Sequence, residues 1–537
     1  MRLSPAFANA AWVASSLPAW LRFKRAASRP DIAQRCCMLR AVGRNANTAY
    51  GRLHRFGEVR NYADFARNVP LARYEDLEPW IKRIVAGEPN VLTSEPVTRL
   101  VPTSGTSSGR KLIPFTASLQ REFDSAISPW IFDLYCNHPG ATLGTAYWSI
   151  TPAAVFEEDQ NSAVPIGFDE DAGYLGGVKK NLLARVIMPP AEFRLIPDTA
   201  VFRYLTLLCL LRQADLSLIS VWHPSFLLLL LGELPLQWEN LLRDVRDGTC
   251  KYDHELPDSV RRAAGSNPEP QRARHLARAG FGQPGVIWPK LRVISCWGDA
   301  HAEGPLNQLH QRLPGIFIQP KGLLATEAFV TFPLGDLHPL AVRSHFYEFE
   351  HDFGRILLAH ELSEGSEYEV IVTTGGGLYR YRLGDRVRVT GYLQNTPCLR
   401  FLGRNGMVSD RFGEKLSEAF VAAAIRSASS SLSETPKFAL LAPEQCAQGM
   451  RYALFIEATV DSGFSRRLDL ALRENPHYLY CRKIGQLSSP DVVEIPDRAY
   501  ERYLAREMEK GKRVGEIKPC ALSTDTGWRQ HLCQASG

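Results

Sequence analysis

The chain has 537 residues, which is too long for one small domain and predicts two or three domains with ample core. Hydrophobic residues make up 45% of it and charged residues 22%, a composition typical of a soluble globular protein. The net charge is +6 and no basic block is present, so nothing in the charge predicts a nucleic-acid partner.

The first half of the chain alternates between helical and strand patterns. The N-terminal 20 residues fit an amphipathic helix. Three apolar runs fit buried strands; they lie at residues 216–222, 291–297 and 316–319. After the first run, a turn at His223-Pro224-Ser225 leads into a predicted helix at 226–234, with Ser225 as its N-cap. We therefore predict an α/β fold, in which ligands bind beyond the carboxyl ends of the strands.

Neither a membrane span nor a disulfide framework is predicted. The most apolar region, residues 205–234, is interrupted by Arg212, Asp215, His223 and Glu233. It therefore lacks the roughly 20 uninterrupted apolar residues that a span needs. The 11 cysteines include no Cys-x-x-Cys pair, which favours reduced thiols in a cytoplasmic protein without structural zinc.

A polar, glycine-rich stretch at 403–413 divides the second half of the chain. Before it, residues 367–374 predict a strand and residues 379–390 predict strand–turn–strand. After it, helical and strand patterns alternate; they lie at residues 416–427, 438–442, 452–460, 466–473, 491–495 and 498–510. We therefore predict an N-terminal domain at 1–410 and a small α+β domain at 411–537.

The first chemical motif is a loop rich in Ser, Thr and Gly within residues 101–116. Its glycines permit close backbone approach, and its N–H groups, hydroxyls and Lys111 can bind a polyanion such as nucleotide phosphates. It is not a Walker A motif, because no Gly-Lys-Ser/Thr follows Gly109. The segment 105–109 also matches Gly-x-Ser-x-Gly, the nucleophile elbow of hydrolases, with Ser107 as nucleophile, although the residues after it look extended. A phosphate loop, an elbow and a plain surface loop all stay open.

Four shorter motifs follow, and each also has a structural explanation. Thr326-Glu327 can offer a hydroxyl to phosphate and a carboxylate to Mg²⁺, or can cap a helix. Asp385, which ends the segment 381–385, can accept hydrogen bonds from a ribose, or can belong to a hairpin turn. Gly403-Arg404 can be a hinge or a charged linker, and Lys518 can be a catalytic cation or part of a surface turn.

In this order the motifs resemble those of the adenylate-forming superfamily. Within it, Ser-Gly-Thr-Ser-Ser-Gly at 104–109, Val-Trp-His-Pro-Ser-Phe at 221–226 and Tyr-Arg-Leu-Gly-Asp at 381–385 resemble the Gretchen-Hagen family of acyl-acid amido synthetases. The resemblance covers nearly the whole chain. It implies a large N-terminal domain with a β-barrel and two helix-flanked sheets, and a small mobile C-terminal domain. It also implies ATP- and Mg²⁺-dependent adenylation of a carboxylic acid, followed by acyl transfer to an amine, typically an amino acid.

The chain departs from the plant members at several motifs. Its phosphate loop is one residue shorter before Lys111, and Ala325-Thr326-Glu327 stands where plants have Ser-Ser-Glu. The motif around Lys518 lacks the plant arginine. The plant substrates, including auxin, are therefore not carried over.

The resemblance assigns roles to individual residues. Glu327 is expected to bind Mg²⁺, and Lys415 and Lys518 are expected to place cations near the α-phosphate during catalysis. The expected nucleotide-binding residues are Thr103, Ser104, Gly105, Thr106, Ser107, Ser108, Gly109, Lys111, Thr326, Asp385 and Arg404. The acid needs an apolar pocket, and the candidates for it are Trp222, Phe226 and Phe346.

Two other activities stay open. An acyl-CoA ligase of the phenylacetate type shares the adenylation motifs but requires CoA. A serine hydrolase acting through Ser107 requires no ATP. For the favoured amide-forming ligase, the expected partners are a small carboxylic acid and an amine, with neither nucleic acid nor membrane, and the expected state is a monomer or weak dimer.

Overall fold

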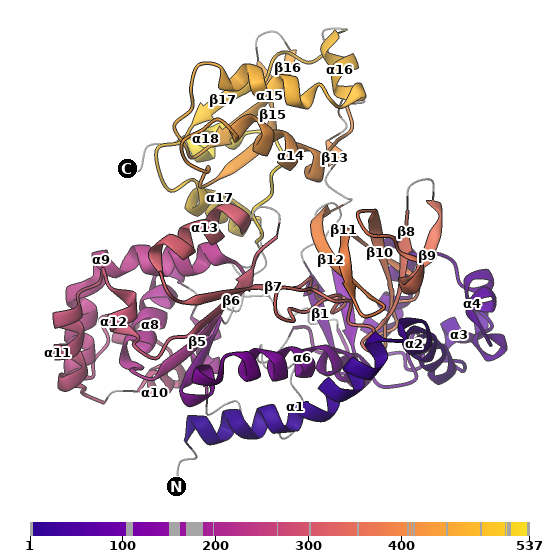
Figure 1. Ribbon diagram of the computed structural model, residues 1–537, viewed down its shortest axis with the longest axis horizontal. Coiled ribbons are helices and arrows are strands. Elements are labelled where there is room, and N and C mark those ends of the chain that lie inside the picture. The colour runs from indigo at the N-terminus through magenta and orange to yellow at the C-terminus, as the bar shows by residue number, and fades with distance from the viewer. Residues whose placement is uncertain are drawn as a thin grey trace. The chain divides into compact units, whose positions relative to one another are not determined.

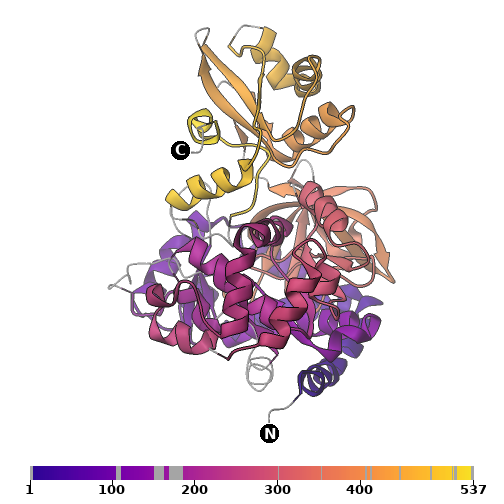
Figure 2. The same ribbon diagram turned by 90° about the vertical axis from the view of Figure 1, so that its left-hand side faces the viewer.

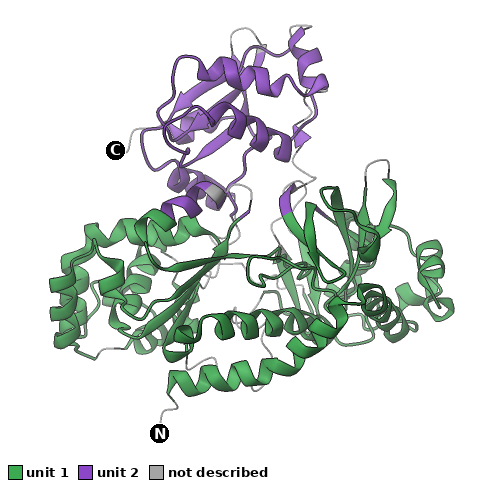
Figure 3. Cartoon of the chain, in the orientation of Figure 1, with its two compact units in different colours: residues 1–298, 310–383, 387–400 green, residues 299–309, 384–386, 401–537 purple. Residues whose placement is uncertain are grey.

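The structure is a computed structural model that describes residues 4–103, 111–149, 162–167, 186–196, 198–265, 267–299, 302–351, 354–404, 408–409, 411, 414–446, 449–483, 486–510, 512 and 517–533. The chain divides into two compact units (Figure 3). Unit 1 comprises residues 1–298, 310–383 and 387–400. Unit 2 comprises residues 299–309, 384–386 and 401–537.

One five-stranded sheet of unit 1 is parallel, with the order β4-β3-β5-β6-β7 (Figure 1). Its strands are β3 (Thr145–Trp148), β4 (Ile187–Met188), β5 (Leu216–Ser220), β6 (Val293–Trp297) and β7 (Phe317–Lys321). Every residue of β5 and β6 is buried, as expected for a parallel sheet that is covered on both faces. The strands predicted at 216–222, 291–297 and 316–319 are confirmed, and their carboxyl ends meet at one edge.

Long helices accompany the parallel sheet. α1 (Pro5–Ala27) packs along α6 (Ala117–Asn137), and α9 (Pro224–Asp247) packs against both α8 (Thr199–Arg212) and α11 (Pro270–Ala279) (Figures 1 and 2). The other helices of unit 1 are α2 (Pro30–Arg44), α3 (Ala49–Leu53), α4 (Tyr62–Asn68), α5 (Tyr74–Val85), α10 (Asp258–Ala264) and α12 (Pro284–Ile287). The helix predicted at the N-terminus is confirmed as α1.

The start of α9 differs from the prediction. Ser225 is not its N-cap, because the helix begins at Pro224. His223 is the N-cap, and its Nδ1 accepts a hydrogen bond from the Ser225 N–H at 3.3 Å. Proline suits the first helical position, where its missing N–H costs nothing.

A second five-stranded sheet has the order β12-β11-β10-β8-β9. Its strands are β8 (Phe346–Glu350), β9 (Ile356–Leu358), β10 (Glu367–Thr373), β11 (Tyr381–Leu393) and β12 (Thr396–Arg404). The prediction of strand–turn–strand at 379–390 is wrong, because β11 runs unbroken through Gly384, whose φ of +76° suits glycine. The resemblance implied a barrel; among the described residues the strand order is that of an open sheet.

The buried charges next to this second sheet are paired. Arg380 Nε donates to both carboxylate oxygens of Glu348 at 3.0 Å, and Arg380 Nη2 donates to Oε1 at 2.7 Å. The Tyr62 hydroxyl donates to the same Oε1 at 2.8 Å. Only 1% of the Glu348 side chain is exposed, so these donors replace the water that burial removes.

Unit 2 has a core of its own. In its three-stranded sheet, β16 (Gly449–Ile456) pairs antiparallel with β15 (Ala439–Cys446) and parallel with β17 (Asp491–Glu494). Its other elements are β13 (Val408–Ser409), β14 (Leu416–Ser417), α14 (Glu418–Ser429), α15 (Phe464–Leu472), α16 (Pro476–Lys483), α17 (Ala499–Glu509) and α18 (Trp528–Leu532). Helix α13 (Glu303–Arg312) begins in unit 2 and ends in unit 1. The predicted elements are confirmed, except that the helix predicted at 416–427 begins at Glu418, and β13, β14, α16 and α18 are additional.

Membrane insertion finds no support among the helices that the structure describes. None of them combines the length and the apolar character that crossing a bilayer requires.

Candidate functional site

The carboxyl ends of the parallel strands gather aromatic and polar side chains. β3 ends at Trp148, β5 at Ser220, β6 at Trp297 and β7 at Lys321. The pairing register places Trp297 beside Lys321. In α/β folds this edge is where ligands bind.

Lys321 is the last residue of β7, the outermost strand, and its side chain reaches back to the ends of β5 and β3. Its Nζ donates to Ser220 Oγ and to the Val221 carbonyl, each at 2.9 Å. The same atom lies 5.0 Å from the ring centroid of Trp222 and 6.0 Å from those of Trp130 and Trp148. Burial lowers the pKa of Lys321 to about 7, because desolvation disfavours the charged form. No sequence motif marks this lysine.

The three residues predicted for the acid pocket have different surroundings. Trp222 is 40% exposed and lies at this edge, against Lys321. Phe226 is half-buried in the first turn of α9. Phe346 is only 3% exposed and packs against the rings of Tyr62 and Phe65, which is a core position. Trp222 is therefore the best-supported member of the predicted pocket, whereas the packing of Phe346 does not favour its predicted role.

The loop after β7 carries Thr326-Glu327. It starts with Gly322, where a Cβ would lie 2.3 Å from the Thr331 carbonyl oxygen, so only glycine fits. The Glu327 side chain is 5% exposed, and its Oε2 has no hydrogen-bond partner among the described residues. Buried polar atoms without partners are rare in proteins and call for an explanation such as an absent ion. A carboxylate oxygen is a ligand that Mg²⁺ prefers, so Glu327 fits the predicted metal role.

No larger metal centre is present in the part of the chain that the structure describes. No group of three or more His, Cys, Asp or Glu side chains there is arranged to hold a metal ion. A cation at Glu327 therefore needs most of its ligands from a bound substrate, as Mg²⁺ often does.

A buried histidine, His345, holds the Thr-Glu loop by a hydrogen bond to its backbone. The Phe329 N–H donates to His345 Nε2 at 3.0 Å, and His345 Nδ1 lies 2.7 Å from Glu122 Oε2. The Gly375 N–H donates to the same Glu122 oxygen at 2.8 Å. These bonds connect α6, the turn at Gly375–Gly377 and the Thr-Glu loop. No sequence motif predicts them, because Glu122 and His345 are 223 positions apart.

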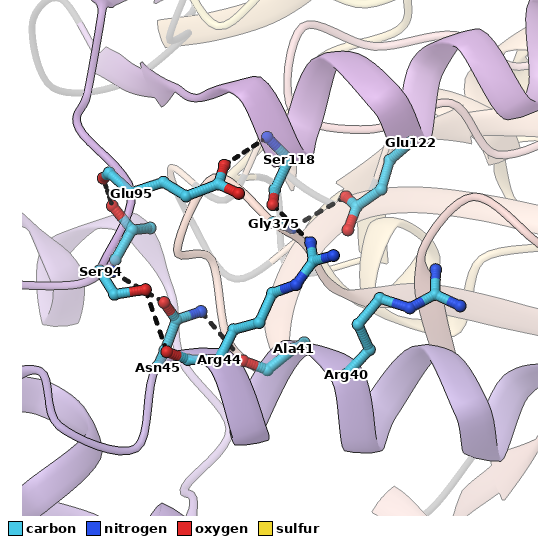
Figure 4. Close-up of a pocket in the computed structure, with 10 residues that line it drawn as sticks. Arg40, Ala41, Arg44, Asn45, Ser94, Glu95, Ser118, Glu122 and Gly375 are labelled. Atoms are coloured by element: carbon cyan, nitrogen blue, oxygen red, sulfur yellow. Dashed lines mark hydrogen bonds between the residues drawn. The ribbon is translucent and has the colours of Figure 1, made fainter.

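Glu122 also lines a small pocket (Figure 4). Its lining includes Arg44, Glu95, Ser118, Glu122 and Gly375. Arg44 Nη1 donates to Ser118 Oγ at 2.7 Å, and the Ser118 N–H donates to Glu95 Oε2 at 2.7 Å. Two arginines, Arg40 and Arg44, and two glutamates, Glu95 and Glu122, line it, so the formal charges balance and give the pocket no preference for a charged ligand.

The predicted phosphate loop begins and ends in an antiparallel hairpin of β1 (Arg99–Thr103) and β2 (Lys111–Phe115). Thr103 and Lys111 are partners in this hairpin, and the predicted residues between them, 104–109, lie outside the described residues. Lys111 Nζ lies 5.4 Å from the ring centroid of Tyr74. A nucleophile elbow leads from a strand into a helix, whereas β2 is a strand, so the hydrolase alternative lacks its expected context.

The remaining predicted residues lie in unit 2. Asp385 is in β11 and 2% exposed, and Arg404 is the last residue of β12. Lys415 is exposed and has a φ of +45°. Lys518 is exposed, and its carbonyl accepts a hydrogen bond from the Tyr503 hydroxyl at 3.0 Å. The described contacts give these four residues no ligand role, so their functions stay predictions.

Comparisons with known proteins point to one family along the chain. Models of the GH3 family match its N-terminal domain at residues 20–316, its central domain at 338–404 and its C-terminal domain at 418–527. The indole-3-acetic acid-amido synthetase GH3.4 of Arabidopsis thaliana is 26% identical over 435 residues, which cover 75% of this chain and 72% of the relative. The putative indole-3-acetic acid-amido synthetase GH3.10 of Oryza sativa subsp. japonica is 26% identical over 428 residues, which cover 75% and 84%.

A solved structure shares the fold. The AtGH3.15 acyl acid amido synthetase in complex with 2,4-DB has a TM-score of 0.82 and 20% identity, and the match covers 95% of each chain. The α/β fold class predicted from the sequence is thereby confirmed. The curated relatives are amide-forming ligases by name.

Proposed function

The chain belongs to the GH3 family, and from this premise we propose that it is an ATP-dependent acid-amido synthetase. It adenylates a small carboxylic acid and transfers the acyl group to an amine, with an amino acid as the expected acceptor. The burial of Glu327 with an unpaired carboxylate oxygen is the single observation that carries the proposal. Its carboxylate is buried with one unpaired oxygen, in a Thr-Glu loop at the ligand-binding edge of a parallel sheet. A group kept in that state is better explained by a ligand than by stability.

In the first half-reaction, a carboxylate oxygen of the acid attacks the α-phosphorus of ATP. A new P–O bond forms, and pyrophosphate leaves with the electrons of the P–O bond that breaks. The protein supplies position and charge for this step. We assign the phosphates to residues 103–109, Lys111 and Thr326, and the ribose to Asp385.

Glu327 is the residue that we assign to Mg²⁺. The ion would neutralise charge on the ATP phosphates when bound. Thr326 would contact the phosphates and Glu327 the ion. The hydrogen bonds from Phe329 to His345 and between His345 and Glu122 orient the loop that carries them.

In the second half-reaction, the nitrogen of the neutral amine attacks the acyl carbon, the C–O bond to the phosphate breaks, AMP leaves with its electrons, and the nitrogen loses one proton to solvent. We propose that residues 411–537 act as a mobile domain that reorients about the glycine-rich stretch at 403–413, with Arg404 in the hinge. Lys518 and Lys415 supply cations to the α-phosphate in the adenylating arrangement. A monomeric or weakly dimeric state and a cytoplasmic location belong to the same proposal.

Acid-dependent exchange of pyrophosphate into ATP tests the first half-reaction, with a library of carboxylic acids. Each acid that supports exchange is then offered amino acids and CoA, and the product mass is measured. Amide products support the proposal, whereas thioester products would move the assignment to an acyl-CoA ligase. Absence of exchange with every acid, together with labelling of Ser107 by a fluorophosphonate, would move it to a hydrolase.

A further inference from the structure

Lys321 is a largely enclosed cation that has no anionic partner in the part of the chain that the structure describes. Among the described residues its side chain contacts a hydroxyl, a carbonyl and three indole rings, and it forms no ion pair with a carboxylate. Indole faces attract a cation, but less strongly than a carboxylate does at close range. The surroundings of Lys321 therefore lack a full counter-charge.

Two of the three N–H donors of Lys321 Nζ have partners among the described residues. An ammonium group has three N–H donors, and two of them are used by Ser220 Oγ and the Val221 carbonyl. The third has no partner among the described residues and is available to an anion at the edge of the sheet, where Trp222 offers an exposed ring.

We propose that Lys321 Nζ binds the carboxylate of the acid substrate, and that Trp222 beside it makes the site prefer planar aromatic acids. This inference rests on the proposed function and names the substrate class of the same site. The carboxylate supplies the missing counter-charge and accepts the third N–H. The ring of the acid packs on the indole of Trp222, as offset aromatic pairs do.

Acid binding at this lysine is coupled to a proton. Free Lys321 has a pKa of about 7 because of its burial, so near neutral pH a large fraction of it is an uncharged amine. A bound carboxylate favours the charged form and raises this pKa. Each acid that binds above pH 7 therefore draws up to one proton from solvent, and its affinity falls as pH rises above the pKa of the free lysine.

Three other titratable groups lie near Lys321 among the described residues, and each has a different role. The Cys296 thiol of β6 is the group that acts electrostatically on Lys321, and burial raises its own pKa to about 12. His223 after β5 uses Nδ1 with the Ser225 hydroxyl, and His338 Nε2 lies 3.0 Å from the Pro320 carbonyl. Neither contact would explain proton uptake that disappears with Lys321.

The test is calorimetric titration of the full chain with indole-3-acetate, phenylacetate, benzoate and octanoate. Each acid is titrated alone and with α,β-methylene-ATP, a nucleotide that cannot release pyrophosphate. Indole-3-acetamide serves as the uncharged counterpart. Titration at pH 7.5 in two buffers of different ionisation enthalpy gives the number of protons taken up, which is independent of catalysis.

The compared proteins are the wild type, Lys321→Met, Lys321→Arg and the control Lys24→Met. Lys24 also lies over a tryptophan, with Nζ 5.6 Å from the Trp20 ring centroid, but it is exposed on α1. Lys321→Met should weaken aryl-acid binding about 10–100-fold, as for loss of a charge-assisted hydrogen bond, and should abolish proton uptake. Lys321→Arg should bind the acid without proton uptake, because arginine stays charged. Lys24→Met should match the wild type.

Several outcomes would overturn the inference. Equal acid affinity in Lys321→Met and wild type would show that the lysine is structural. Tighter binding of octanoate than of every aryl acid would remove the aromatic preference. If some acid supports pyrophosphate exchange while either result holds, the proposed function stands and only this inference fails. A wild type that neither binds nor activates any acid overturns both.

Discussion

The charged side chains beside the two five-stranded sheets differ in whether they have ionic partners. Beside the sheet β12-β11-β10-β8-β9, Arg380 and Glu348 form a bidentate pair, and Arg382 pairs with Glu350. At the carboxyl edge of the parallel sheet, Lys321 and Glu327 have no ionic partner among the described residues. A buried charge with a partner contributes to a unique fold, whereas one without a partner costs stability and is kept for a ligand. The comparison therefore separates structural from functional charges without reference to any motif.

The largest expected effect comes from breaking a structural pair. Arg380→Met leaves Glu348 buried without its main partner and should destabilise the fold by about 3–5 kcal/mol. Chemical unfolding followed by circular dichroism measures the loss. Arg380→Met combined with Glu348→Gln should recover part of it, because the unpaired charge is gone. A single variant as stable as the wild type would contradict the structural assignment of this pair.

The opposite behaviour is expected for Glu327. Glu327→Gln should lower acid-dependent pyrophosphate exchange by about 10²–10³-fold, as for loss of one preorganised electrostatic group. Its stability should stay equal or rise, because the substitution removes a buried charge that has an unpaired oxygen. Exchange and unfolding are measured on the same preparation. A destabilised variant that retains exchange would turn Glu327 into a structural residue and remove the contrast between the two sheets.

The sequence predicted strands of the parallel sheet, but only some of the residues at its carboxyl edge. The apolar runs at 216–222 and 291–297 became β5 and β6 because such runs suit a sheet covered on both faces. Glu327 was found through its motif. Lys321 was missed because its three tryptophans come from α6, the end of β3 and the residues after β5, which only the folded chain brings together.

Two local features of the backbone also differ from what the sequence predicted. A hairpin was expected around Gly384, but pairing with neighbouring strands kept β11 continuous. Ser225 was expected to cap α9, yet Pro224 at the first helical position made His223 the cap. In both cases the preference of a residue type, glycine for a turn and serine for an N-cap, was overridden by its structural context.

Lys518 extends the comparison to unit 2, where it is exposed rather than buried. If it serves only the adenylating arrangement, Lys518→Ala should slow acid adenylation by about 10²-fold or more and leave consumption of pre-formed acyl-adenylate near the wild-type rate. The two half-reactions are measured separately in rapid-mixing experiments. An equal fall in both would mean that Lys518 acts in both arrangements, and no change in either would leave Lys415 as the better candidate.

The smallest effect is expected where a carboxylate is paired with a helix terminus. Glu95 accepts from the Ser118 N–H in the first turn of α6 and from Arg121. Burial raises the pKa of Glu95, but these hydrogen bonds outweigh it and leave the pKa lowered. A lowered carboxyl pKa stabilises the fold above the unfolded pKa, and this stability is lost as pH falls through the folded pKa. Glu95→Gln should therefore cost only about 0.5–1 kcal/mol at pH 7, since the site is partly exposed.

Thermal unfolding between pH 2 and pH 8 checks the sign of this effect. The difference between wild type and Glu95→Gln should be largest at pH 7, should begin to shrink below the unfolded glutamate pKa of about 4.3, and should disappear only below the lowered folded pKa, where Glu95 is protonated in both states. Glu88→Gln is the matched control, because Glu88 pairs with Arg83 on the surface without capping a helix, and it should cause no measurable change. A pH-independent cost for Glu95→Gln would mean that the shape of the side chain, and not its charge at the helix terminus, holds the start of α6.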